Sequence, residues 1–115
     1  MQKILIVDDK SDIRDLLSDI LSDEGYKTIT ASNAKAALTA AESERPDLVI
    51  LDIWLEGSEF DGVGVLKRIK ERQANLPVIM ISGHGNIETA IQTIKLGAYD
   101  FIEKPFKAEK LSVII

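Results

Sequence analysis

Five short apolar runs alternate with segments of helical periodicity, and this alternation constrains the fold more than any other feature of the chain. Most of the runs are continuous and rich in β-branched residues, as is typical of strands covered on both faces. The run at 26–30 has polar residues interleaved and is expected at a sheet edge. The predicted strands are 3–7, 26–30, 48–53, 77–82 and 99–103. Strict alternation of strands with helices predicts an α/β fold, with a parallel sheet and helices on both of its faces.

The helices expected between these strands are defined by apolar residues that recur every three or four positions. Either Ser32 or Asn33 is expected to cap the second helix, and a fifth helix, over 107–115, is short. The predicted buried positions are Ile13, Leu16, Leu17, Ile20 and Leu21 in the first helix, Ala34, Ala37, Leu38 and Ala41 in the second, Val63, Leu66 and Ile69 in the third, and Ile87, Ala90, Ile91 and Ile94 in the fourth.

Length and composition restrict the class of protein and the kinds of site. With 115 residues, the chain is expected to form one domain over 1–115, and its apolar end, SVII, favours a fragment of a longer protein. A net charge of −5 argues against a nucleic-acid-binding surface. No cysteine and a single histidine exclude disulfides, thiolate zinc sites and polyhistidine centres. With no signal peptide and no apolar run near the roughly 20 residues that span a bilayer, a cytoplasmic protein without membrane contact is expected.

Polar side chains stand where the predicted strands end. The first strand ends in Asp8 and Asp9, the third ends at Asp52, the fourth at Ser82 and the fifth at Lys104. The carboxyl ends of parallel strands meet at one edge of a sheet, where open α/β sheets bind their ligands. We therefore expect these side chains to converge.

A single aspartate after a strand is commonly a turn former or a helix cap, and Ser11 or Asp12 would serve here as the cap. Two adjacent aspartates exceed that need, and Asp52 follows LVIL with no turn signal. Buried carboxylates that lie together repel and need compensation. Mg²⁺, which prefers carboxylate, carbonyl and water oxygens, is the natural candidate, and Lys104 offers a second compensating charge.

Five segments stand in order along the chain: VDD (7–9), LVILDIWL (48–55), DG (61–62), VIMISG (78–83) and GAYDFIEKPF (97–106). Together they resemble the receiver domain of two-component response regulators, over essentially the whole chain. The segment DIWLEGSEFDG, with a loop at 55–62 longer than the family's usual one, further resembles NtrX-type regulators of nitrogen and redox control. This resemblance implies a doubly wound five-stranded sheet in the flavodoxin-like order 2-1-3-4-5.

The resemblance also implies a role for each acid. Asp52 would be the phosphoacceptor, a carboxylate nucleophile that forms an aspartyl-phosphate. Asp9 would bind Mg²⁺ directly and Asp8 through water. The backbone carbonyl of Trp54 would be a further ligand, with its side chain at the rim of the site.

The remaining roles concern the phosphoryl group and the response to it. Ser82 would donate its hydroxyl to a phosphoryl oxygen, and Lys104 would pair with the phosphoryl group as a point charge. Phe101 occupies the family's switch position, expected to turn inward as Ser82 moves; the alternative is an ordinary core aromatic. His84 is interpreted as a solvated loop histidine, although its position can tune phosphate lifetime in the family.

The implied partner is a sensor histidine kinase, which donates the phosphoryl group. A homodimer could form through 87–94, 99–103 and 107–115, and a transcriptional output domain is expected beyond residue 115. The domain is expected to catalyse only its own phosphotransfer and dephosphorylation, so it is not an enzyme acting on other substrates.

Three alternatives remain. A haloacid-dehalogenase-like phosphatase needs a second acid where Trp54 stands, and a flavodoxin-like nucleotide binder needs a glycine- or hydroxyl-rich loop where DDKSD stands. A degenerate receiver would act as a phosphorylation-independent protein-binding module. Such a receiver typically lacks one of the acids or the lysine, and this chain keeps them all.

Overall fold

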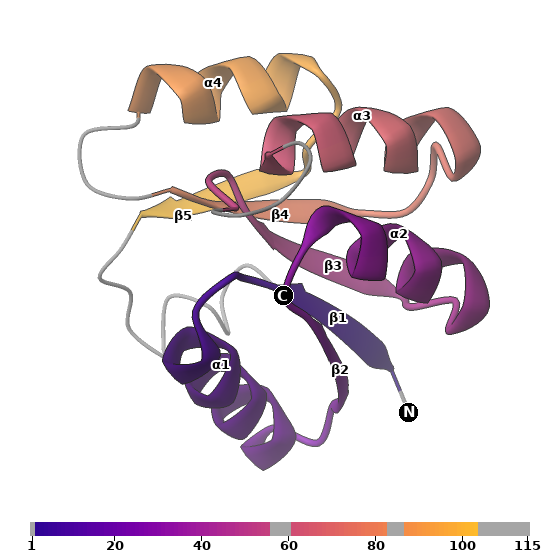
Figure 1. Cartoon of the computed structure of the whole chain (residues 1–115), viewed down its shortest axis with the longest axis vertical. Coiled ribbons are helices and arrows are strands. Elements are labelled where there is room, and N and C mark those ends of the chain that lie inside the picture. The colour runs from indigo at the N-terminus through magenta and orange to yellow at the C-terminus, as the bar shows by residue number, and fades with distance from the viewer. Residues whose placement is uncertain (1, 56–60, 83–86, 104–115) are drawn as a thin grey trace.

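Five parallel strands form one sheet at the centre of the molecule, in the order β2-β1-β3-β4-β5 (Figure 1). This computed structural model describes residues 2–55, 61–82 and 87–103. The predicted α/β class, parallel sheet and strand order are confirmed. The strands are β1 (Lys3–Val7), β2 (Lys27–Ala31), β3 (Leu48–Asp52), β4 (Val78–Ser82) and β5 (Asp100–Glu103).

Four helices cover the sheet within the described residues: α1 (Ser11–Asp23), α2 (Ala34–Ser43), α3 (Gly62–Arg72) and α4 (Ile87–Lys95). In Figure 1, α2, α3 and α4 lie on one face and α1 lies on the other, so the sheet is doubly wound as predicted. The predicted fifth helix, 107–115, lies outside the described residues.

Each face of the sheet has its own apolar core, which explains the continuous rather than alternating pattern of the strands. In β1, Leu5 and Val7 face the cluster under α2 and α3, while Ile4 and Ile6 face the cluster under α1. All four side chains are buried. Full burial of an aliphatic side chain contributes about 1.5 to 3 kcal/mol. Both faces of the central strands therefore anchor the edge at which they end.

Local signals begin and end the helices close to the predicted positions. Asn33, rather than Ser32, caps α2: its side-chain oxygen accepts the Ala36 N–H at 2.8 Å. Gly25, which follows α1, has a φ of 93°, a conformation that glycine adopts without a steric penalty. Among the described ranges, no helix combines the length and the apolar content needed to cross a bilayer.

Two of the predicted buried helix faces are partly wrong. Leu16 on α1 is 47% exposed, and Ile91 and Ile94 on α4 are 47% and 39% exposed. The sheet side of α4 instead buries Ala90 and Thr93. The larger apolar residues Ile91 and Ile94 are therefore on the exposed side of this helix.

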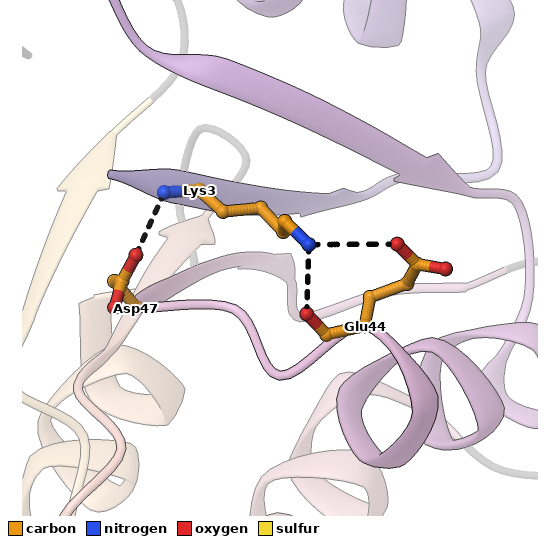
Figure 2. Close-up of polar contacts among 3 residues, drawn as sticks. All are labelled: Lys3, Glu44 and Asp47. Atoms are coloured by element: carbon orange, nitrogen blue, oxygen red, sulfur yellow. Dashed lines mark hydrogen bonds and ion pairs between the residues drawn. The ribbon is translucent and has the colours of Figure 1, made fainter. Parts of the chain in front are cut away.

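A polar contact fastens β1 at the edge of the sheet where the strands begin. Figure 2 shows Lys3 between Asp47 and Glu44: its backbone N–H donates to the Asp47 carboxylate at 2.8 Å, and its Nζ donates to the Glu44 carbonyl at 3.0 Å. The same Nζ lies 3.7 Å from Glu44 Oε1. These contacts join β1 to the turn between α2 and β3, at the opposite end of the strands from the acidic residues.

Candidate metal site

Asp8, Asp9 and Asp52 converge at the edge where β1 and β3 end. One carboxylate oxygen from each lies within 4.8 Å of the others. The pairing of the two strands accounts for this convergence, because Val7 is aligned with Leu51, and the acids follow directly. The predicted meeting of these three acids is confirmed.

Two of the three carboxylates are nearly inaccessible to water. Asp8 is fully buried, Asp52 is 4% exposed and Asp9 is half-buried. Amide N–H groups two residues along the chain meet both buried carboxylates: Lys10 N donates to Asp8 Oδ1 at 2.9 Å, and Trp54 N lies 3.4 Å from Asp52 Oδ1. Side-chain bonds of this kind are Asx-turns, which hold a short polar side chain against its own backbone. The carboxylates are therefore oriented before any ligand arrives.

Arg14 closes the turn between β1 and α1. Its Nη1 donates to the carbonyl oxygen of Asp8 at 2.7 Å, and its backbone N–H donates to Lys10 O at 3.1 Å. Lys10 occupies the N-cap of α1 but makes no side-chain capping bond. The side chain of Arg14, one turn into the helix, thus bonds to the loop that carries the first two acids. No motif in the sequence predicted a role for this residue.

Helix α3 begins in contact with the backbone of Asp52. Gly62 N donates to Ile53 O at 2.7 Å, and a Cβ atom on Gly62 would lie 1.9 Å from the Asp52 carbonyl oxygen. Asp61 caps the helix by accepting the Gly64 N–H at 3.3 Å. Only glycine allows this approach. The DG pair at 61–62 therefore has two structural roles: Asp61 caps the N-terminus of α3, and Gly62 allows the helix to contact the backbone at the end of β3.

The three acids fit a divalent cation with hard oxygen ligands. Octahedral Mg²⁺ binds oxygens at about 2.1 Å, so its ligands lie roughly 3 to 4 Å apart. Carboxylate oxygens within 4.8 Å of one another suit a mixture of direct and water-mediated contacts. A cation at this site would also offset the repulsion among three neighbouring negative charges.

The other predicted site residues are placed to different extents. Trp54 lies two residues beyond Asp52 with its side chain 49% exposed, as expected at a rim. Ser82 ends β4, the strand next to β3, one residue beyond the Asp52–Ile81 pair. Phe101 is half-buried in β5 and packs against the core under α3 and α4. Lys104, His84 and 56–60 of the long loop lie outside the described residues.

Comparisons with known proteins identify the family to which the chain belongs. The response regulator receiver domain family matches residues 4–115. The chain belongs to this family. The resemblance predicted from the motifs is therefore confirmed, and the domain is a receiver domain with the family's sheet order.

Relatives of this receiver domain include NtrX proteins. The chain is 58% identical over 111 residues to "Nitrogen assimilation regulatory protein NtrX" of Azorhizobium caulinodans, a match covering 96% of this chain and 24% of that protein. The receiver domain of NtrX from Brucella abortus has a TM-score of 0.95 and 59% identity, covering 96% of this chain and 92% of that one. The predicted resemblance to the NtrX type is confirmed, and the chain spans about a quarter of the length of these full regulators.

A second kind of relative is much shorter. "Sporulation initiation phosphotransferase F" of Bacillus subtilis is 40% identical over 110 residues, a match that covers 96% of this chain and 87% of that protein. Receiver domains thus occur among the relatives both as most of a protein and as a part of a longer one.

Proposed function

We propose that this receiver domain accepts a phosphoryl group on Asp52 from the phosphohistidine of a sensor kinase, with Mg²⁺ bound by Asp8, Asp9 and Asp52. The observation that carries the proposal is the gathering of three carboxylates, two of them buried, at the carboxyl edge of the sheet. Membership of the receiver family supports the kinase as partner.

The chemistry follows from the position of Asp52. A carboxylate oxygen of Asp52 attacks phosphorus, an O–P bond forms, and the P–N bond to the kinase imidazole breaks in line with it. Asp8 and Asp9 would hold the cation together with the Trp54 carbonyl. When bound, Mg²⁺ supplies positive charge that neutralises the phosphoryl oxygens and the carboxylates.

Ser82 and Lys104 complete the proposed site. The position of Ser82 at the end of the strand next to β3 suits a hydroxyl donor to a phosphoryl oxygen. Lys104, directly after β5, would contribute a cation to the same group. In this proposal the domain catalyses only its own phosphorylation and dephosphorylation.

The proposed response to phosphorylation involves α4, β5 and the residues after β5. Phe101 would turn inward as Ser82 moves toward the phosphoryl group. The outward side of α4 and the turn after it expose a group of apolar side chains, namely Ile91, Ile94, Leu96 and Tyr99, the last of which is 66% exposed. Exposed apolar surface favours a docking site, and we propose a second copy of the domain as its occupant.

The proposed setting is a longer cytoplasmic regulator in which residues 1–115 form the receiver domain. This is supported by relatives about four times as long, among them regulators whose names refer to nitrogen assimilation and to transcription. In such a protein the receiver would control a transcriptional output related to nitrogen supply, without itself contacting DNA.

Intact-mass measurement after incubation with Mg²⁺ and a small phosphodonor tests the proposal. Acetyl phosphate and phosphoramidate supply P–O and P–N donors. Wild type is expected to gain one phosphoryl group, and Asp52→Asn and chelator-treated protein none. Asp47→Asn is the matched control, because it removes a carboxylate at the opposite edge of the sheet. Mg²⁺ binding without an adduct from either donor would contradict the proposal and favour a phosphorylation-independent binding module.

A further inference from the structure

The carbonyl that Arg14 contacts belongs to the peptide group that joins Asp8 to Asp9. The Arg14 guanidinium donates to this oxygen at 2.7 Å, and both flanking segments are held as well: Lys10 N bonds to Asp8 Oδ1, and Arg14 N bonds to Lys10 O. A hydrogen bond to a peptide oxygen fixes the plane of that peptide. The direction in which the Asp9 side chain leaves the backbone is thereby fixed too.

Charge alone does not explain an arginine at this place. Its guanidinium is permanently positive and, by Coulomb's law, opposes binding of a cation by the neighbouring carboxylates. The contact, however, is with a main-chain oxygen and not with a carboxylate oxygen of Asp8 or Asp9. The guanidinium is therefore placed to orient the backbone of the metal site, and not to compete with the cation for the carboxylates.

We infer that Arg14 is a positioning residue for the divalent cation, holding the Asp8–Asp9 peptide in the orientation that metal binding requires. The inference rests on the proposed Mg²⁺ site. The two effects of replacing Arg14 have opposite directions. Loss of its positive charge by itself would strengthen Mg²⁺ binding, whereas loss of its hydrogen bond to the Asp8 carbonyl oxygen weakens it. Residues that orient metal ligands typically change metal affinity by about 10- to 100-fold when replaced.

The test measures the Mg²⁺ dissociation constant of folded protein through the fluorescence of Trp54, the only tryptophan, whose backbone N–H lies 3.4 Å from Asp52 Oδ1. Arg14→Met is expected to bind Mg²⁺ about 10-fold more weakly than wild type. Arg14→Lys keeps the charge but lacks the planar fork of donors, and is expected to fall between the two. Arg72→Met, the matched control, removes one positive charge near the opposite edge of the sheet and should leave the dissociation constant unchanged.

Two further readouts separate positioning from folding. A merely structural role would lower the free energy of unfolding in urea and leave the Mg²⁺ dissociation constant of the folded protein unchanged. Positioning predicts instead that saturating Mg²⁺ restores the rate of phosphorylation by acetyl phosphate in Arg14→Met. If Arg14→Met does not fold, Arg14→Lys is expected to bind Mg²⁺ more weakly than wild type, with a larger dissociation constant.

The possible failures are distinguishable. Unchanged or tighter Mg²⁺ binding by Arg14→Met, or by Arg14→Lys where only that variant folds, overturns the inference and leaves the proposed metal site intact. If wild type binds no Mg²⁺, the proposed metal site and the inference both fail.

Discussion

Replacing Gly62 with alanine tests how closely α3 approaches the acceptor strand. The added Cβ would lie 1.9 Å from the Asp52 carbonyl oxygen, 2.8 Å from its carbonyl carbon and 2.9 Å from Ile53 Cα. The first distance is roughly 1.5 Å shorter than ordinary van der Waals contact. All three atoms belong to the backbone of β3 and the residue after it, so no side chain can rotate out of the way. Either α3 or the end of β3 must move.

Three free-energy contributions determine the expected effect of Gly62→Ala. Overpacking costs about 1 to 3 kcal/mol, and displacement of α3 weakens the 2.7 Å bond from Gly62 N to Ile53 O, a loss of about 1 kcal/mol. Against these, alanine gains about 0.5 to 1 kcal/mol over glycine in a helix. The net expectation is a decrease of about 1 to 3.5 kcal/mol in the free energy of unfolding.

Urea unfolding measures this decrease, and Gly25→Ala is the comparison. Gly25 has a φ of 93°, and a Cβ atom there would meet no described residue within 4 Å. Gly25→Ala is therefore expected to lower the free energy of unfolding through backbone strain alone, by about 1 to 2 kcal/mol. Gly62→Ala is also expected to weaken Mg²⁺ binding by displacing Asp52, whereas Gly25→Ala is not. A Gly62→Ala protein as stable as wild type would refute the close approach.

Three other predictions concern caps, charges and pH. Asn33→Ala removes the cap of α2 and is expected to lower the free energy of unfolding by about 1 kcal/mol in urea; no change would contradict the capping bond. Asp52→Asn reduces repulsion among the acids. In Mg²⁺-free protein it is expected to raise the free energy of unfolding by about 1 kcal/mol, and with it the melting temperature. A lower melting temperature would mean that the negative charge of Asp52 is fully compensated in the folded protein. Burial lowers the pKa of Lys70 from its ordinary value of 10.5. At pH values below the lowered pKa, the charged ammonium group decreases the free energy of unfolding. This decrease is lost as the pH rises from the lowered pKa to 10.5. The stability of wild type relative to Lys70→Met, measured by urea unfolding, should therefore increase across that alkaline window; a decrease would reverse the sign of the shift.

Much of the scaffold follows from local patterns. The runs KILIV and LVILD are buried on both faces because helices cover the two sides of a parallel sheet, and continuous apolar sequence reports that arrangement. The site also follows, because Asp8, Asp9 and Asp52 stand where adjacent strands end.

Other features depend on tertiary geometry that periodicity does not encode. In α4, isoleucines and alanine share the apolar pattern, yet Ala90 and Thr93 are buried and Ile91 and Ile94 are exposed. Apolar spacing alone does not say which of these neighbouring positions faces the sheet. Arg14 gave no usable signal, since its partner is a backbone oxygen. The close approach of Gly62 required the positions of two elements at once.

The identity of the phosphoacceptor is the most direct test of the proposed function. After phosphorylation by acetyl phosphate with Mg²⁺, borohydride reduces the acyl phosphate to an alcohol and converts the modified aspartate to homoserine. Tandem mass spectrometry of the peptides that contain the ends of β1 and β3 is predicted to place homoserine at position 52 and at neither position 8 nor position 9. Homoserine at position 8 or 9, or its absence from all three positions, would contradict the assignment of Asp52 as the nucleophile.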